Sequence, residues 1–172
     1  MPARPLRSLI LAPLALLLGG AAVPPTEARF LERFSGAWSG AGVVHRNAES
    51  GPQKVNCRLS GERSENRISI AGTCRAYLVF SRKISAEITY DPASRQYSGT
   101  YVGSRVGPAS LAGKRRGDTV NLAVRWPRPV NGDRTARMRI VNDGAGSLRI
   151  VVTDDYGEGE TTVTDVALAR AG

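Results

Sequence analysis

The chain has 172 residues and contains 24 Lys or Arg against 15 Asp or Glu, which gives a formal net charge of +9 at pH 7. This length corresponds to one domain that is large enough to bury its own core. With two Cys and one His, the chain has too few residues for a histidine-based metal centre or for the usual pairs of nucleophile and base. We therefore expect it not to be an enzyme and to need no cofactor.

Residues 1–28 have the composition of a secretory signal peptide. Two arginines precede an apolar run over 9–18, and small residues follow. The run is too short to span a bilayer of roughly 30 Å. Cleavage after Ala22 and cleavage after Ala28 fit equally well, and we take 29–172 as the single mature domain. No Cys near these positions could carry a lipid anchor, so we expect a periplasmic or secreted protein.

Residues 29–34 carry apolar side chains at helical spacing, which predicts one short helical turn. Beyond them, apolar and polar residues alternate through most of the chain, a period-two pattern typical of β-strands with one buried face. We predict ten strands, near 35–46, 54–60, 67–80, 83–91, 96–103, 109–115, 118–126, 135–142, 147–154 and 161–169.

The two cysteines lie on neighbouring predicted strands. A turn centred near Glu65-Asn66 places Cys57 directly opposite Cys74 in the register that the apolar pattern favours. An exported chain leaves the reducing compartment, so we expect the two thiols to form a disulfide. Such a cross-link would stabilise the fold by roughly 3 kcal/mol in the chain-entropy model.

The later turns join strands whose apolar residues face each other. The pattern predicts the cross-strand pairs Tyr90–Tyr97, Leu111–Leu122, Ile140–Leu148 and Ile150–Val166. Consecutive hairpins with one apolar face form a meander, which buries that face by closing into a barrel or by splitting into a sandwich. We predict an all-β, antiparallel up-and-down meander closed as a barrel of about eight to ten strands. The opposite face carries many arginines, which excludes a lipid-facing barrel.

The first predicted strand begins with the motif Gly36-Ala37-Trp38 after a helical turn. A Gly-x-Trp at the head of a β-meander resembles the calycins, which include the lipocalins, the fatty-acid-binding proteins and the nitrobindin-like barrels. In lipocalin-like members the Trp closes the base of the barrel and a basic residue of the last strand lies over its ring. The resemblance implies these roles for Trp38 and Arg170.

Two further features bear on the resemblance. Nitrobindin-like barrels would have a haem-ligating His in the C-terminal half, whereas the single His here is His45, so we expect no haem. The chain also resembles, more loosely, the bacterial secreted metalloprotease inhibitors, which are small exported barrels with a Gly-x-Trp strand and an early disulfide. In that alternative, Arg29–Ser35 would enter an enzyme cleft.

Several aromatic side chains fall on the predicted inner face, where they either fill the barrel or line a pocket. The candidate lining residues are Trp38, Tyr97, Tyr101 and Trp126. Glycine and alanine occupy several neighbouring inner positions, which is compatible with a cavity. We therefore expect an exported binding protein that holds a small, largely apolar ligand, with Tyr hydroxyls fixing its orientation.

Arginines gather on the predicted outer face, at Arg125, Arg137, Arg139 and Arg149. The predicted pairing sets Arg139 opposite Arg149, and such like charges are relieved by an anionic partner, by nearby carboxylates or by water. A structural envelope protein that binds anionic surfaces through this face is a third alternative. Nucleic acid is not expected, because export removes it and the face lacks interleaved aromatic residues.

The last predicted turn is acidic, with carboxylates at Asp154, Asp155, Glu158 and Glu160. A solvated hairpin tip is the expected role of these side chains. Calcium binding is an alternative, although their order does not follow the EF-hand loop.

Overall fold

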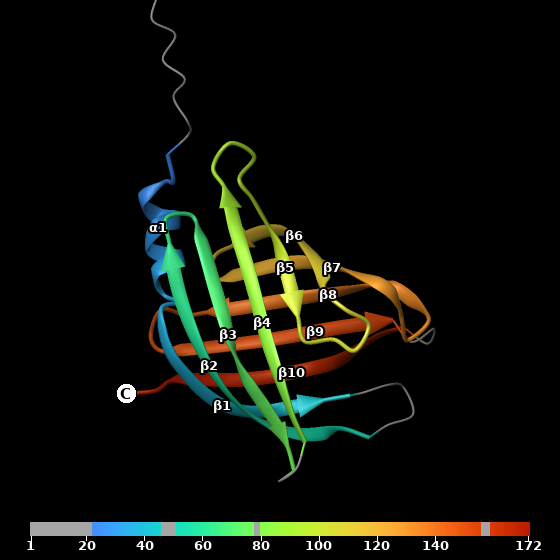
Figure 1. Ribbon diagram of the computed structural model, residues 1–172. Coiled ribbons are helices and arrows are strands. Elements are labelled where there is room, and N and C mark those ends of the chain that lie inside the picture. The colour runs from blue at the N-terminus through green and yellow to red at the C-terminus, as the bar shows by residue number, and fades with distance from the viewer. Residues whose placement is uncertain (1–21, 46–50, 78–79, 156–158) are drawn as a thin grey trace, which may run out of the picture.

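Helix α1 (Pro25–Glu32) precedes ten strands in the computed structural model, which describes residues 22–45, 51–77, 80–155 and 159–172. The strands are β1 (Gly36–Val44), β2 (Gln53–Ser64), β3 (Arg67–Ala76), β4 (Phe80–Asp91), β5 (Gln96–Val102), β6 (Ala109–Arg116), β7 (Thr119–Val130), β8 (Asp133–Asn142), β9 (Ser147–Asp155) and β10 (Glu160–Arg170). Each strand pairs antiparallel with its neighbours in sequence, and β1 also pairs with β10, which closes the sheet (Figure 1). The predicted all-β meander, closed as a barrel after a short helix, is confirmed.

The alternation that predicted the strands also decides which side chains face the interior. In β7, Val120, Leu122, Val124 and Trp126 are buried, while the residues between them are exposed. Successive side chains of a strand point to opposite faces of the sheet. The apolar half of the pattern therefore fills the barrel, and the Arg-rich half forms its outer wall. No helix within the described ranges has the length and apolar character that crossing a membrane requires.

The register between β2 and β3 is the predicted one. Cys57 lies opposite Cys74, and the two form a disulfide with an S–S distance of 2.00 Å. Tyr90 also lies opposite Tyr97, as predicted. The disulfide agrees with a protein that folds in an oxidising compartment.

The predicted register between β6 and β7 is wrong by two residues. Leu111 lies opposite Val124 rather than Leu122. The turn is made by Gly117 and Asp118, one residue later than predicted, and Gly117 has a φ of +59°. Glycine adopts such a positive φ without the steric cost that a side chain would add. Because the shift is two residues, every side chain stays on its predicted face.

The register between β8 and β9 also differs from the prediction by two residues, since Ile140 lies opposite Ile150 rather than Leu148. The Asp143 carboxylate accepts the backbone amides of Ala145 and Ser147, at 2.8 and 3.0 Å. These hydrogen bonds hold a turn whose centre lies one residue later than the predicted Ile140–Leu148 pair implies. The Ile150–Val166 pair between β9 and β10 is as predicted.

The strand predicted over 67–80 is divided between two elements. Strand β3 ends at Ala76, and Tyr77 follows with a φ of +56°. Phe80 belongs to β4 and lies opposite Ala76. Leu78 and Val79, which the prediction placed in the same strand, lie outside the described residues.

Candidate functional site

Helix α1 covers the end of the barrel at which β1 begins, which we call the closed end (Figure 1). The helix starts at Pro25, four residues before the turn predicted over 29–34. Proline suits the first helical position because its ring already holds the φ angle that a helix needs. Phe30, Leu31 and Phe34 are buried, so an apolar plug fills the closed end.

Trp38 is part of this plug. Its indole Nε1 donates a hydrogen bond to the Phe34 carbonyl at 3.0 Å, and the Arg170 guanidinium carbon lies 4.6 Å from the ring centroid. Gly61 permits this arrangement, since a Cβ there would lie 1.9 Å from the Phe34 carbonyl oxygen. The contact between Trp38 and Arg170 that the calycin resemblance implied is therefore present.

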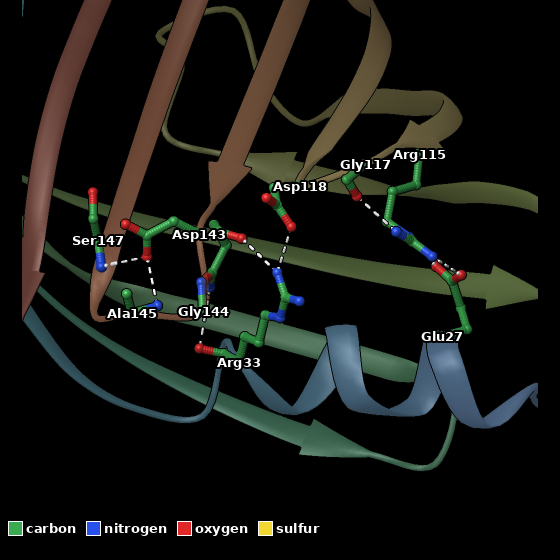
Figure 2. Close-up of polar contacts among 10 residues, drawn as sticks. Glu27, Arg33, Arg115, Gly117, Asp118, Asp143, Gly144, Ala145 and Ser147 are labelled. Atoms are coloured by element: carbon green, nitrogen blue, oxygen red, sulfur yellow. Dashed lines mark hydrogen bonds and ion pairs between the residues drawn. The ribbon is translucent and has the colours of Figure 1, made fainter.

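Glu27 of α1 places a buried carboxylate at the closed end. It accepts hydrogen bonds from Arg115 Nε and Nη2, at 2.9 and 2.7 Å (Figure 2), and from the Tyr97 hydroxyl. Burial alone would raise the pKa of Glu27, but the hydrogen bonds from Arg115 and Tyr97 outweigh it and hold the pKa below its usual range. Burial and the Glu27 carboxylate raise the pKa of Tyr97. The Tyr97 hydroxyl is thus used within the protein.

The C-terminal end of α1 is fastened to two hairpin turns. Arg33 Nη1 donates to Asp118 Oδ1 at 2.6 Å and to the Asn142 carbonyl at 3.1 Å, and Figure 2 shows the guanidinium lying between these turns. Asn142 Nδ2 in turn donates to the Arg33 carbonyl at 3.1 Å. The segment Arg29–Ser35, which the inhibitor alternative would insert into an enzyme, is therefore held against its own barrel.

The opposite end of the barrel, which we call the open end, has inner walls that are less completely buried. Its inner apolar residues pack against the core but keep part of their surface exposed: Val44, Ala76, Ile84, Tyr101, Val106 and Val130. In Figure 1 the β5–β6 and β7–β8 connections lie at this end, away from α1. Apolar walls with residual exposure are what a ligand entering from this end would contact.

Trp126 lies on the inner wall of the open end. Its side chain is 8% exposed, and its ring meets that of Tyr101 edge to face, with centroids 6.3 Å apart. The indole Nε1 is buried and has no acceptor within the described part of the chain. A buried donor without a partner costs about 1–3 kcal/mol. The two tryptophans therefore differ in their hydrogen bonding. The N–H of Trp38 donates to a carbonyl of the protein, whereas the N–H of Trp126 has no acceptor among the described residues.

Tyr101 brings a second polar group to the open end. A Cβ on Gly103 would lie 2.4 Å from the Tyr101 hydroxyl oxygen, so the hydroxyl reaches along β5 toward the connection that follows it. Burial raises the pKa of this hydroxyl, with the Arg82 charge acting in the opposite direction. Arg82 Nη1 donates to the Gly103 carbonyl at 3.1 Å, which holds a cation at the rim.

Asp154, near the end of β9, is buried rather than solvated as predicted. Its carboxylate accepts Asn131 Nδ2 at 2.8 Å and the Asp155 amide at 3.0 Å. Burial raises the pKa of this carboxyl, and nearby acidic groups add to the shift. The Asp154 side chain therefore favours its neutral form more than an exposed carboxyl does.

The acidic residues of the last turn do not converge. Glu160 accepts a hydrogen bond from Arg137 at 3.0 Å and another from the Thr153 hydroxyl, whereas Asp154 turns toward Asn131. Glu158 lies outside the described residues. Among the residues that are described, no three His, Cys, Asp or Glu side chains are grouped so that they could hold a metal ion.

The outer-face arginines are partly neutralised by carboxylates of β10. Arg137 pairs with Glu160, and Arg149 pairs with Asp165 at 2.5 Å. The predicted juxtaposition of Arg139 and Arg149 is wrong, because the two-residue shift between β8 and β9 places Val151 opposite Arg139. An open groove of about 730 Å³ runs beside Arg137 and Arg139. Arg125 makes no ion pair with any described residue.

The four aromatic residues predicted to line one lumen fall into two groups. Trp38 and Tyr97 lie at the closed end, where both of their polar groups bond to the protein. Tyr101 and Trp126 lie together at the open end. Sequence reasoning missed Glu27, because it was counted in the signal peptide. The Pro24-Pro25 pair just before it was a usable signal for a helix start.

Comparison with known proteins identifies a fold but no family. No protein-family model and no curated protein matches the sequence. The crystal structure of Rv2717c from M. tuberculosis has a similar fold, with a TM-score of 0.66 and 13% sequence identity, covering 88% of this chain and 99% of that one. The likeness shows a shared barrel architecture, which is compatible with a calycin-like fold.

Proposed function

We propose that this chain is a calycin-like binding protein that takes a small, largely apolar ligand into the open end of its barrel. The observation that carries the proposal is the buried Nε1 of Trp126, which has no acceptor among the described residues. A ligand oxygen placed against this N–H would satisfy it. The free energy that the unpaired donor costs would then contribute to binding.

The surroundings of Trp126 indicate the chemistry of the ligand. The inner walls of the open end are apolar and partly exposed, so most of the ligand surface would be apolar. Tyr101 lies in the same wall, with its ring edge to face against that of Trp126, and its hydroxyl provides a second polar group. The ligand that fits is an apolar molecule with one polar head that bears a hydrogen-bond acceptor, such as a carbonyl or hydroxyl oxygen.

We propose binding without catalysis. Two titratable side chains at the open end, Tyr101 and Asp154, both have a pKa raised by burial. A tyrosine that resists ionisation is a poor nucleophile. The Asp154 carboxylate is also engaged by Asn131. Both groups are better suited to hydrogen bonding than to abstracting a proton at neutral pH.

We also propose that the protein is exported and works in the periplasm or outside the cell. The signal-like residues 1–28 motivate this proposal, and the Cys57–Cys74 disulfide supports it. The shared architecture with Rv2717c and the stacking of Arg170 on Trp38 support the calycin-like assignment.

The binding proposal is tested by fluorescence titration with Nile red, an uncharged apolar probe that carries a carbonyl oxygen as a hydrogen-bond acceptor. We expect saturable binding that is insensitive to salt and that weakens about tenfold in the Trp126→Phe variant, the effect of one lost hydrogen bond. Arg125→Gln, on the outward side of the same strand, is the control and should bind like the wild type. Equal affinity in all three proteins, or binding removed by salt, would overturn the proposal.

A further inference from the structure

Two exposed aromatic side chains, Tyr77 and Phe80, flank the turn between β3 and β4, and we call this pair the tip. Tyr77 is 71% exposed and Phe80 is 66% exposed. Tyr77 directly follows β3 with a φ of +56° and Phe80 begins β4, so both residues lie where the chain reverses. In Figure 1 the end of β3 and the start of β4 lie at the bottom of the view, away from α1. The high exposure of Tyr77 and Phe80 leaves both side chains accessible to a surface that approaches this end of the hairpin.

A third exposed apolar residue lies on the strand next to this hairpin. Val102, at the end of β5, is 46% exposed and lies opposite Ser85 of β4. Among the described residues, Tyr77, Phe80 and Val102 are the large apolar side chains that remain exposed. All three lie on or beside one hairpin rather than being scattered singly over the surface. Grouped exposed apolar residues mark an interaction site.

The charge around these residues has one sign. The exposed cations of this region are Lys54, Arg75, Arg82, Lys83 and Arg105. The segments 51–61, 67–86 and 96–106, which contain them, include no Asp or Glu. On the outer wall, Arg75 lies opposite Ser81 and Lys83 lies opposite Thr73, so both cations lie within a few residues of the aromatic tip.

Aromatic side chains surrounded by cations fit the surface of an anionic bilayer. Tyr and Phe rings partition into the boundary between headgroups and acyl chains, and Lys and Arg are attracted to anionic headgroups. A purely electrostatic partner would leave Tyr77 and Phe80 without a role, and a purely apolar partner would leave the cations unpaired. We propose that the β3–β4 tip docks the barrel onto membranes that contain anionic phospholipid.

The docking site is separate from the outer-face arginines of β7, β8 and β9. It lies at the rim of the open end, because the Arg82 guanidinium donates to the Gly103 carbonyl there. A docked barrel would therefore turn its open end toward the bilayer. The inference does not rest on a ligand in the lumen, since it depends only on the exposed tip and its charge.

The experiment is sedimentation of the oxidised protein with vesicles of phosphatidylglycerol and phosphatidylethanolamine, compared with vesicles of phosphatidylcholine. We expect binding to the anionic vesicles and little to the neutral ones. The double variant Tyr77→Ser, Phe80→Ser should weaken partitioning at least tenfold. Unchanged far-UV circular dichroism and an unchanged urea midpoint would show that this variant folds, as expected for substitutions of exposed residues.

Charge reversal provides a matched control. Arg75→Glu with Lys83→Glu should weaken binding to anionic vesicles by tenfold or more, because two attractive contacts become repulsive. Lys114→Glu with Arg125→Glu makes the same change in net charge on β6 and β7, and should reduce binding much less. Equal losses in the two charge variants would overturn the proposal. The proposal would also be overturned if the wild type formed a dimer and the double variant Tyr77→Ser, Phe80→Ser were monomeric, since the tip would then bind a second copy of the chain.

Discussion

The two tryptophans offer a direct test of the difference between the two ends of the barrel. Both are buried, at 1% exposure for Trp38 and 8% for Trp126. The Nε1 of Trp38 donates to the Phe34 carbonyl at 3.0 Å, whereas that of Trp126 has no acceptor among the described residues. Replacing each by Phe removes the same atoms, so the two variants share the loss of ring burial and differ in the hydrogen bond.

The expected free energies follow from this contrast. Ring truncation alone should cost roughly 1–2 kcal/mol at either site. At Trp38 the variant also loses a hydrogen bond and leaves the Phe34 carbonyl without a donor, a further cost of about 1–3 kcal/mol. At Trp126 the variant removes a donor that was already unpaired, which recovers about 1–3 kcal/mol. Trp38→Phe should therefore be clearly destabilising, while Trp126→Phe should be close to neutral.

The assay is urea unfolding followed by far-UV circular dichroism, because each variant keeps a single tryptophan and its fluorescence baseline changes. We expect the unfolding free energies of the two variants to differ by about 2–6 kcal/mol, with Trp126→Phe the more stable. Equal destabilisation would refute the reasoning, since it would mean that Trp126 Nε1 is satisfied in the unliganded protein.

Three further predictions follow from other parts of the structure. Replacing Cys57 and Cys74 together by Ala should cost about 3 kcal/mol in urea unfolding, given their separation of 17 residues; a change below 1 kcal/mol would mean that the cross-link restrains the unfolded chain little. Because burial raises the pKa of Asp154, the stability contributed by its neutral form is complete below about pH 4 and is lost as pH rises through the folded pKa. The stability of Asp154→Asn relative to the wild type should therefore increase from pH 4 to pH 7, and a difference that is constant with pH would contradict this. Since Glu27 is buried against the barrel, cleavage of the proposed signal peptide should leave Val23 as the first residue by intact mass, and a chain that begins at Arg29 would contradict this.

The strands and the disulfide could be predicted from the sequence because they depend on a period of two. In β7 every second residue from Val120 to Trp126 is apolar, and this alternation determines which face of the strand is buried. The same pattern places Cys57 opposite Cys74 without any knowledge of the fold. Alternation does not fix a register to better than two residues, however, and Gly117 and Asp143 decided two registers through local turn geometry.

The candidate site was only half predictable for a related reason. Alternation shows that Trp38, Tyr97, Tyr101 and Trp126 face inward, but it does not show which end of a closed barrel each side chain reaches. That depends on where the helix plugs the barrel and on which donors find partners. Because Glu27 precedes the predicted start of the domain, the sequence did not reveal that its carboxylate accepts a hydrogen bond from the Tyr97 hydroxyl.

The central claim is that the open end holds a ligand against Trp126, and native mass spectrometry of the oxidised protein from its own host tests it most directly. The wild type and the Arg125→Gln variant should carry a reproducible extra mass in the range of a lipid or metabolite, and organic extraction should release it. Trp126→Phe should carry much less of that mass. A bare wild-type protein, or the same bound mass in Trp126→Phe, would contradict the account.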